Sequence, residues 1–284
     1  MRPAPRLFGI CATAADVVAV VRRGPSNWTH LGLWDLTSQQ FQSGSWLRAR
    51  VYQQRCDVSP DGLYLCYFAL NGGAQWSAGG TYIAVSRLPW FTALAAWGTQ
   101  GTYTWGAHFV EDRTSWTLPE PDEGDDGPLR RRYGMAMTHP QDFAVERRRG
   151  WTDLPGSAQP AGDVRGEPRV ERYRVGRPRP GQPKRRQHDI WLVASGGYAA
   201  HRSMDGRYYR PPAYDLRDGP GGPVLISLDG VQWADWARDG RLLVATTDGR
   251  LQIRDGSTAA VRWELSLAEL TPTPRPPPPQ ARHW

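Results

Sequence analysis

The sequence has almost no lysine and few cysteines. Of its 35 basic residues only Lys184 is a lysine, and the three cysteines, Cys11, Cys56 and Cys66, form no C-x-x-C metal-ligand pair. An odd number of cysteines leaves at least one thiol unpaired, which favours a reducing, cytosolic compartment. Cys56 and Cys66 lie symmetrically about Asp61, so a hairpin there would set them opposite each other. They are therefore either a cross-strand disulfide or two small apolar core residues.

The sequence also lacks long apolar runs and the motifs of the common catalytic sites. No window approaches about eighteen uninterrupted apolar residues, so we expect neither a transmembrane helix nor a membrane partner. There is no Walker-type Gly-rich loop, no G-x-S-x-G and no H-E-x-x-H, and the 6 histidines have no ligand spacing. These absences predict a protein that is not an enzyme and that binds no metal and no cofactor.

Large aromatic residues and turn residues are abundant. The 14 Trp, 11 Tyr and 6 Phe provide bulky core side chains, and the 31 Gly and 25 Pro provide turns. We expect a single all-β domain over residues 1–270. Residues 271–284 form a proline-rich tail, which we expect to be an extended spacer or, alternatively, a ligand for an SH3-like proline-binding partner.

Four short strands joined by tight turns are predicted between residues 231 and 267. They are Val231 to Trp236, Arg241 to Thr247, Arg250 to Arg254 and Val261 to Leu267. Asp239-Gly240 and two later Asp-Gly pairs separate them, and Asp-Gly is a strong hairpin signal because glycine adopts a positive φ without strain. A unit of about 40 residues with four antiparallel strands has the size of one β-propeller blade.

Two earlier stretches repeat this pattern. Residues 5–46 contain a similar succession of apolar runs and turns, and residues 50–97 predict strands at Arg50 to Val58, Leu63 to Leu70, Thr81 to Ser86 and Phe91 to Trp97. The segment Asp57-x-x-x-Asp61-Gly62 matches Asp235-x-x-x-Asp239-Gly240. Asp205-Gly206 marks a third copy, in which His201 takes the place of the earlier aspartate.

These repeats resemble those of a known family. Ser59-Pro60-Asp61-Gly62 between two apolar strands, and Trp34-Asp35-Leu36 closing another, are similar to the repeats of WD-repeat and related bacterial β-propeller proteins. The resemblance covers residues 5–97 and 203–267. It implies an all-β propeller of about five four-stranded blades, with six as the alternative, that serves as a non-catalytic scaffold for protein partners.

The middle of the chain combines candidate strands with two insertions. Strands are expected at Thr102 to Val110, Ser115 to Leu118, Tyr133 to Thr138, Phe143 to Arg147 and Asp189 to Ala194. The insertions, residues 119–132 and 154–187, are rich in acidic residues and in Pro, Gly and Arg respectively. We expect both to be mobile loops, because neither has enough apolar side chains to offset the entropy cost of ordering.

The second insertion carries the basicity of the chain. Residues 165–187 hold nine basic and two acidic side chains, an excess of seven that equals the net charge of +7. The candidate binding residues are Arg169, Arg172, Tyr173, Arg174, Arg177, Arg179, Lys184, Arg185 and Arg186. They could contact an acidic protein, or phosphates of a nucleic acid with Tyr173 stacking on a base. The other interpretations are compensation by the acidic insertion and a solvated segment without function.

Two further functions remain as alternatives. Some propellers are glycosidases that use paired carboxylates, for which Asp57 and Asp235 are the candidates; the structural interpretation is that they cap loops. A lectin would need exposed tryptophans, whereas tryptophans between blades are packing residues. The tryptophans considered are Trp76, Trp90, Trp105, Trp151, Trp191, Trp233 and Trp236.

Overall fold

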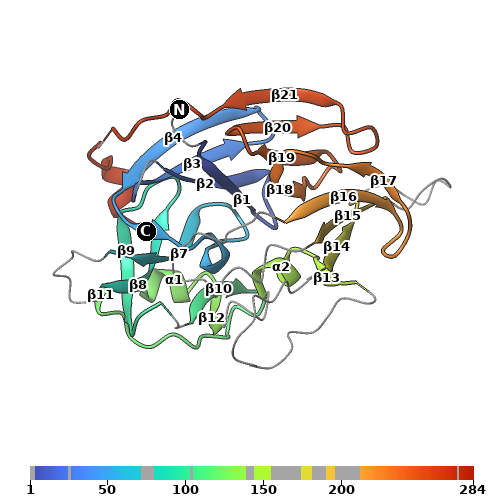
Figure 1. Ribbon diagram of the computed structural model, residues 1–284. Coiled ribbons are helices and arrows are strands. Elements are labelled where there is room, and N and C mark those ends of the chain that lie inside the picture. The colour runs from blue at the N-terminus through green and yellow to red at the C-terminus, as the bar shows by residue number, and fades with distance from the viewer. Residues whose placement is uncertain are drawn as a thin grey trace, which may run out of the picture. The chain divides into compact units, whose positions relative to one another are not determined.

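The computed structural model is built almost wholly from antiparallel β-sheets (Figure 1). It describes residues 4–24, 27–71, 80–102, 105–138, 144–154, 174–180, 190–195, 212–273 and 275–284. The chain divides into two compact units, Met1–Arg149 with Glu269–Trp284 and Gly150–Ala268, called here the first and second units. The all-β class expected from the sequence is confirmed. No helix in the described part of the chain is long and apolar enough to cross a membrane.

The first sheet of the first unit corresponds to the repeat expected over residues 5–46. It consists of β1 (Arg6–Cys11), β2 (Val17–Arg23), β3 (Thr29–Asp35) and β4 (Gln40–Leu47), paired in chain order. The apolar run of β2 is buried on both faces, since Val18, Ala19, Val20 and Val21 are all inaccessible to solvent. The local pattern of runs and turns therefore predicted this sheet correctly.

The second sheet contains the repeat expected over residues 50–97, with one correction. Its strands are β5 (Arg50–Val51), β6 (Asp57–Val58), β7 (Tyr64–Leu70), β8 (Thr81–Arg87), β9 (Ala93–Thr99) and β11 (Glu123–Gly124). The single strand expected from Arg50 to Val58 is wrong, because the 3₁₀ turn η1 (Gln53–Arg55) divides it. Val51 pairs with Ala69 and Asp57 with Cys66, so residues 52–56 stand opposite only residues 67–68. The surplus residues coil into the 3₁₀ turn.

The stretch from 105 to 149 departs most from expectation. The strands β10 (Gly106–Val110) and β12 (Gly134–Thr138) pair, but Ser115 to Leu118 forms only an isolated bridge between Trp116 and Met135. The strand expected at Phe143 to Arg147 is wrong, because Ala144–Arg148 is the short helix α2. Alanine, glutamate and arginine have high helix propensity, and this local preference prevails there.

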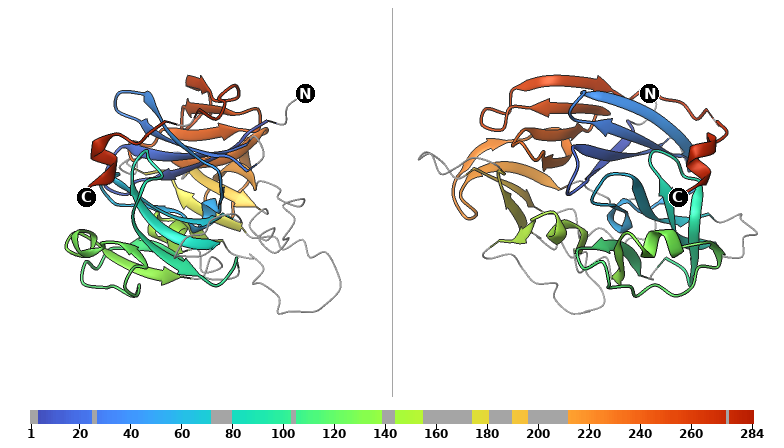
Figure 2. Two further views of the ribbon diagram at one scale, coloured as in Figure 1. Left: turned by 90° about the vertical axis from the view of Figure 1, so that its left-hand side faces the viewer. Right: turned by 180° about the vertical axis from the view of Figure 1, so that it is seen from behind.

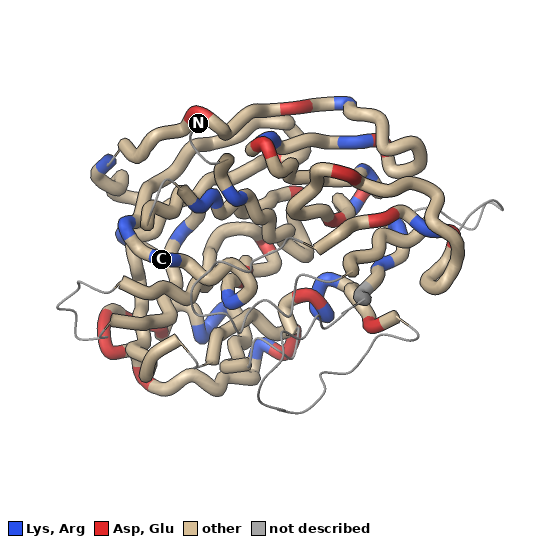
Figure 3. Tube along the Cα trace, viewed as in Figure 1, with Lys and Arg blue, Asp and Glu red and all other residues tan. Residues whose placement is uncertain are grey.

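The acidic insertion is partly ordered rather than a mobile loop. It contains β11 and the helical turn α1 (Gly127–Arg130), and Figure 3 shows its acidic residues grouped together. Leu129 is fully buried in the cluster formed by β7 to β10 and β12, and Arg130 pairs with Asp126 at 2.9 Å. Leu129 therefore anchors the acidic insertion to the core, which the composition of the insertion did not indicate.

The second unit holds two sheets. The first comprises β13 (Thr152–Asp153), β14 (Arg174–Pro178), β15 (Ile190–Ser195), β16 (Ala213–Asp218) and β17 (Val224–Ser227). The other comprises β18 (Val231–Trp236), β19 (Leu242–Thr246), β20 (Arg250–Arg254) and β21 (Val261–Ser266), which confirms the four strands predicted there. β14 lies inside the insertion 154–187, so the expectation of a continuous loop is wrong at that point.

The tail is not a simple spacer. It ends in the 3₁₀ turn η4 (Pro279–Arg282), which contacts β8 of the first unit (Figure 2). Ala281 is fully buried, and Trp284 packs against the cluster that contains Tyr64. Ala281 and Trp284 thus attach the tail to the first unit, although its prolines predicted an extended spacer.

The turn glycines adopt the backbone conformation that the repeat predicts. Gly62 has φ of 75° and Gly240 has φ of 86°. In the first turn, Ser59 Oγ accepts hydrogen bonds from the N–H groups of Leu63 (3.1 Å) and Tyr64 (3.0 Å). The third copy, Asp205-Gly206, lies outside the described residues.

Replacing these glycines by valine should destabilise the protein. A side chain at positive φ costs about 1 to 2 kcal/mol. A Cβ would also lie 3.1 Å from Val17 Cβ at Gly62, and 3.0 Å from the Pro180 carbonyl oxygen at Gly240. Gly62→Val and Gly240→Val should each lower the melting temperature by several degrees in a thermal unfolding scan. Gly221→Val is the matched control, because nothing lies within 4 Å of a Cβ at Gly221; equal melting of all three variants would refute the turn assignment.

Candidate functional site

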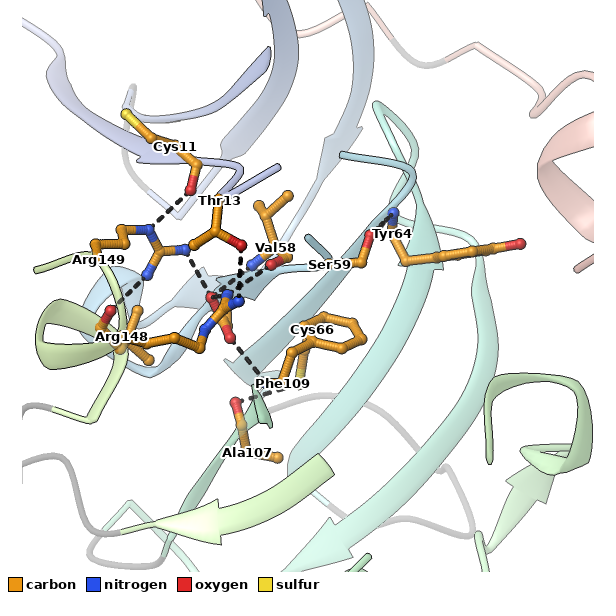
Figure 4. A network of polar contacts seen from close by, with 12 residues as sticks. Cys11, Thr13, Val58, Ser59, Tyr64, Cys66, Ala107, Phe109, Arg148 and Arg149 are labelled. Atoms are coloured by element: carbon orange, nitrogen blue, oxygen red, sulfur yellow. Dashed lines mark hydrogen bonds and ion pairs between the residues drawn. The ribbon is translucent and has the colours of Figure 1, made fainter. Parts of the chain in front are cut away.

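Asp57 is the centre of a buried polar network in the first unit (Figure 4). Its Oδ1 accepts hydrogen bonds from Arg148 Nη2 (2.7 Å), from Arg149 Nη2 (2.6 Å) and from the backbone N–H of Val58 (2.8 Å). Its Oδ2 accepts the N–H of Phe109 (2.8 Å). The carboxylate is 0% exposed and receives four donors. It therefore has no surface left for a substrate.

Both arginines are positioned by the end of α2. Arg149 Nη1 donates to the Val145 carbonyl at 2.9 Å, and its Nε donates to the Cys11 carbonyl at the end of β1 at 2.8 Å. Arg148 Nη2 also donates to the Val58 carbonyl at 2.8 Å. The network thus joins β1, β6, β10 and α2, which belong to three different sheets and a helix.

The electrostatics favour the charged form of Asp57. Burial by itself would raise the pKa of Asp57, but attraction by Arg149 and Arg148 and their hydrogen bonds outweigh it and hold the pKa below its ordinary value. Burial lowers the pKa of Arg148, which Asp57 counteracts. Burial likewise lowers the pKa of nearby His108. Asp57 is therefore an ionised structural anchor and a poor general acid at neutral pH.

Asp235 shares part of this arrangement in the second unit. Its Oδ1 accepts the N–H of the next residue, Trp236, at 2.8 Å, as the Oδ1 of Asp57 accepts that of Val58. Arg177 Nη1 of β14 pairs with Asp235 at 2.8 Å, and Trp236 Nε1 donates to the Arg177 carbonyl at 3.2 Å. The matched aspartates, Asp57 and Asp235, each form an ion pair with an arginine that is distant in the sequence but adjacent in the fold. The repeat alignment therefore identified a shared structural role.

The candidate binding residues of the basic insertion have different positions. Arg177 and Arg179 lie in β14 and just after it; Arg179 Nη1 donates to Ser257 Oγ at 2.6 Å, and its guanidinium passes over Gly240 and Gly256. Arg174 begins β14, and nothing further is described of its side chain. Arg169, Arg172, Tyr173, Lys184, Arg185 and Arg186 lie outside the described residues.

Sequence analysis did not identify the partners of the two aspartates. Arg148 and Arg149 directly follow a stretch expected to be a strand, Phe143 to Arg147, and Arg177 was one of nine cations in an expected loop. Each ion pair joins residues far apart in the chain, 92 positions for Asp57 and Arg149. The one related feature of the sequence is its excess of arginine over lysine. Arginine is the cation suited to buried ion pairs with several hydrogen bonds.

The tryptophans and cysteines are mostly core residues. Trp151, Trp233 and Trp236 are buried, Trp90 and Trp191 are half-buried, and Trp105 is 50% exposed, while Trp76 lies outside the described residues. The three cysteines are buried and none forms a disulfide, so the interpretation of Cys56 and Cys66 as apolar core residues is confirmed over the disulfide. In the described part of the chain, no three His, Cys, Asp or Glu side chains gather into a metal site.

Comparison with known proteins gives little. No family model matches the chain, and no curated protein matches it. Among solved structures, Sqt1 of Saccharomyces cerevisiae aligns over 87% of this chain and 70% of its own at 8% identity and a TM-score of 0.28. An uncharacterized protein from Listeria monocytogenes, lmo1340, aligns over 94% and 84% at 11% identity and a TM-score of 0.31. Similarity this low supports no conclusion about fold or function.

Proposed function

We propose that the protein is a non-catalytic interaction module built on a β-propeller. The described residues form five antiparallel sheets of two to six strands, and five is the expected number of blades if each sheet is one blade. The Ser-Pro-Asp-Gly turn and the matched aspartates of two sheets support a common ancestry of these units. An interaction role is not implied by such a fold alone, so it needs support from the site.

The observation that carries the proposal is the engagement of both candidate catalytic carboxylates. A glycosidase needs one carboxyl group that can donate a proton and a second that can reach the sugar or a water molecule. Asp57 is fully buried beneath two arginines, and Asp235 is 3% exposed and paired with Arg177. Both are thus explained as anchors of the fold, and this favours binding over hydrolysis.

The contact surface that we propose is formed by those cations of the basic insertion that lie outside the described residues. Of its nine cations, Arg177 and Arg179 bind residues of the second unit and Arg174 belongs to β14. Six remain, namely Arg165, Arg169, Arg172, Lys184, Arg185 and Arg186. Six cations in 22 residues produce a strong local positive potential, which suits an acidic protein surface.

A binding panel tests the proposal. The full-length protein is incubated at 50 mM salt with poly-glutamate, a single-stranded oligonucleotide and neutral glycans. Saturable binding of poly-glutamate supports an acidic protein partner, and tighter binding of the oligonucleotide at equal charge assigns the surface to nucleic acid. Binding of a glycan alone, or its cleavage, would overturn the proposal in favour of a lectin or a hydrolase.

A further inference from the structure

The tail from 275 to 284 is attached to the first unit by few contacts. Ala281 is fully buried and Trp284 is half-buried, but most of the other residues of this stretch are exposed. A single hydrogen bond joins it to a strand in the described part of the chain, from Arg87 Nε to the His283 carbonyl at 3.4 Å. A segment held by two apolar side chains and one long hydrogen bond can detach at low cost.

Trp284 packs on the ring of Tyr64, around which Arg87, Arg132 and Tyr133 lie; Tyr64 and these three residues are called here the cradle. Their own hydrogen bonds hold this cradle together. The Tyr64 hydroxyl accepts from Arg87 Nη2 (3.2 Å) and Arg132 Nη1 (3.3 Å). Arg132 pairs with Asp61 at 3.3 Å, and the Tyr133 hydroxyl donates to the same carboxylate at 2.6 Å. Because none of these bonds involves the tail, the cradle is preorganised without it.

The cradle has the chemistry of a site for a tryptophan side chain that follows a proline-rich segment. Trp284 lies 5.5 Å from Tyr64 between ring centroids, and the guanidinium groups of Arg87 and Arg132 stand 5.3 and 5.6 Å from the Tyr64 ring. Pro278, which leads into η4, has φ of −66° and ψ of 159°, the polyproline II conformation. Peptides in this conformation bind aromatic surfaces with little loss of entropy, because they are extended before they bind.

We propose that this cradle binds proline-rich peptides that carry an alanine and a tryptophan three residues apart, and that the chain's own tail occupies it intramolecularly. The tail then competes with such peptides for the cradle. A tethered segment of this length has an effective concentration on the order of millimolar, so it excludes weaker ligands until it is displaced or removed. This inference is independent of the proposed function, since it uses a different unit and no residue of the basic insertion.

The test measures binding of the tail supplied as a separate peptide. A labelled peptide of residues 271–284 is titrated by fluorescence anisotropy against the intact chain and against a variant that ends at Leu270. The truncated variant should bind it about tenfold or more tighter than the intact chain, because its cradle is empty. A Trp284→Ala peptide should lose this binding, whereas an Arg282→Ala peptide should retain it, since Arg282 is exposed.

A second variant keeps the test decisive if truncation prevents folding. In the full-length chain, Trp284→Ala should free the tail, increase the rate of its proteolysis and open the cradle to the labelled peptide, and Arg282→Ala should do none of these. Absence of peptide binding to both the truncated and the Trp284→Ala proteins would overturn the proposal. Equal binding of the parent and Trp284→Ala peptides would also overturn it.

Discussion

Asp57→Asn is expected to lower the free energy of unfolding by about 3 to 5 kcal/mol, because it leaves two buried arginines without a counter-charge. Oδ1 and Oδ2 both accept from N–H donors, so the amide NH₂ of asparagine must face a donor whichever way it turns. Urea denaturation at pH 7 measures the change. The effect should be present throughout the range above about pH 4, where the carboxylate is ionised in both states, and should shrink as pH falls through the lowered pKa of the folded protein.

Asp239→Asn provides the matched control for this aspartate. Asp239 also pairs with an arginine, Arg241 at 2.6 Å, but its side chain is 52% exposed. Exposed pairs contribute about 0 to 1 kcal/mol. If Asp57→Asn lowers the free energy of unfolding by no more than Asp239→Asn does, the buried network does not anchor the fold. The interpretation of Asp57 as a structural rather than a functional charge would then be wrong.

Arg177→Ala should cost about 2 to 5 kcal/mol, although the sequence places this residue among candidate binding cations. Its removal leaves Asp235, with a side chain only 5% exposed, without its cation. Arg241→Ala removes an arginine of the exposed pair and should change stability by about 0 to 1 kcal/mol. Both variants, Arg177→Ala and Arg241→Ala, should bind poly-glutamate with the affinity of the parent protein. A stable Arg177→Ala protein that no longer binds would show that this arginine belongs to the contact surface instead.

The parts of the fold that the sequence predicted are those set by neighbouring residues. The last sheet was predicted strand by strand, because alternating apolar residues and Asp-Gly turns act within a few positions. The same holds for the positive φ of Gly62 and Gly240. Where helix propensity competed with a short apolar run, as in Ala144–Arg148, the wrong element was predicted.

The site and the exceptions to the fold depend on distant residues. Arg149 reaches Asp57 only because β1, β6, β10 and α2 meet, which no local pattern encodes. β14 forms within a Pro-rich, Arg-rich stretch because β13 and β15 pair with it on both sides. The tail docks onto residues distant in the sequence, with Trp284 on Tyr64 and the His283 carbonyl on Arg87, 196 positions away. Composition predicted a mobile loop for the insertion and an extended spacer for the tail, because it counts apolar residues without knowing what they contact.

Deleting residues 165–187 would be a poor test of the basic insertion, since it would remove β14 and Arg177 along with the six cations of the proposed contact surface. The more specific variant replaces only Arg165, Arg169, Arg172, Lys184, Arg185 and Arg186 by glutamine. It retains the strand and both of its arginine contacts, so its melting temperature should equal that of the parent.

The affinity of this six-glutamine variant for a polyanion tests the central claim most directly. The measurement is the retardation of a single-stranded oligonucleotide at 50 and 200 mM salt. The parent should bind at 50 mM and lose about two to three orders of magnitude in affinity at 200 mM, as for a handful of phosphate contacts. The variant should not bind at either salt concentration. Unchanged retardation by the folded variant, or no binding of either the oligonucleotide or poly-glutamate by the parent at 50 mM, would contradict the assignment of these six cations to a contact surface.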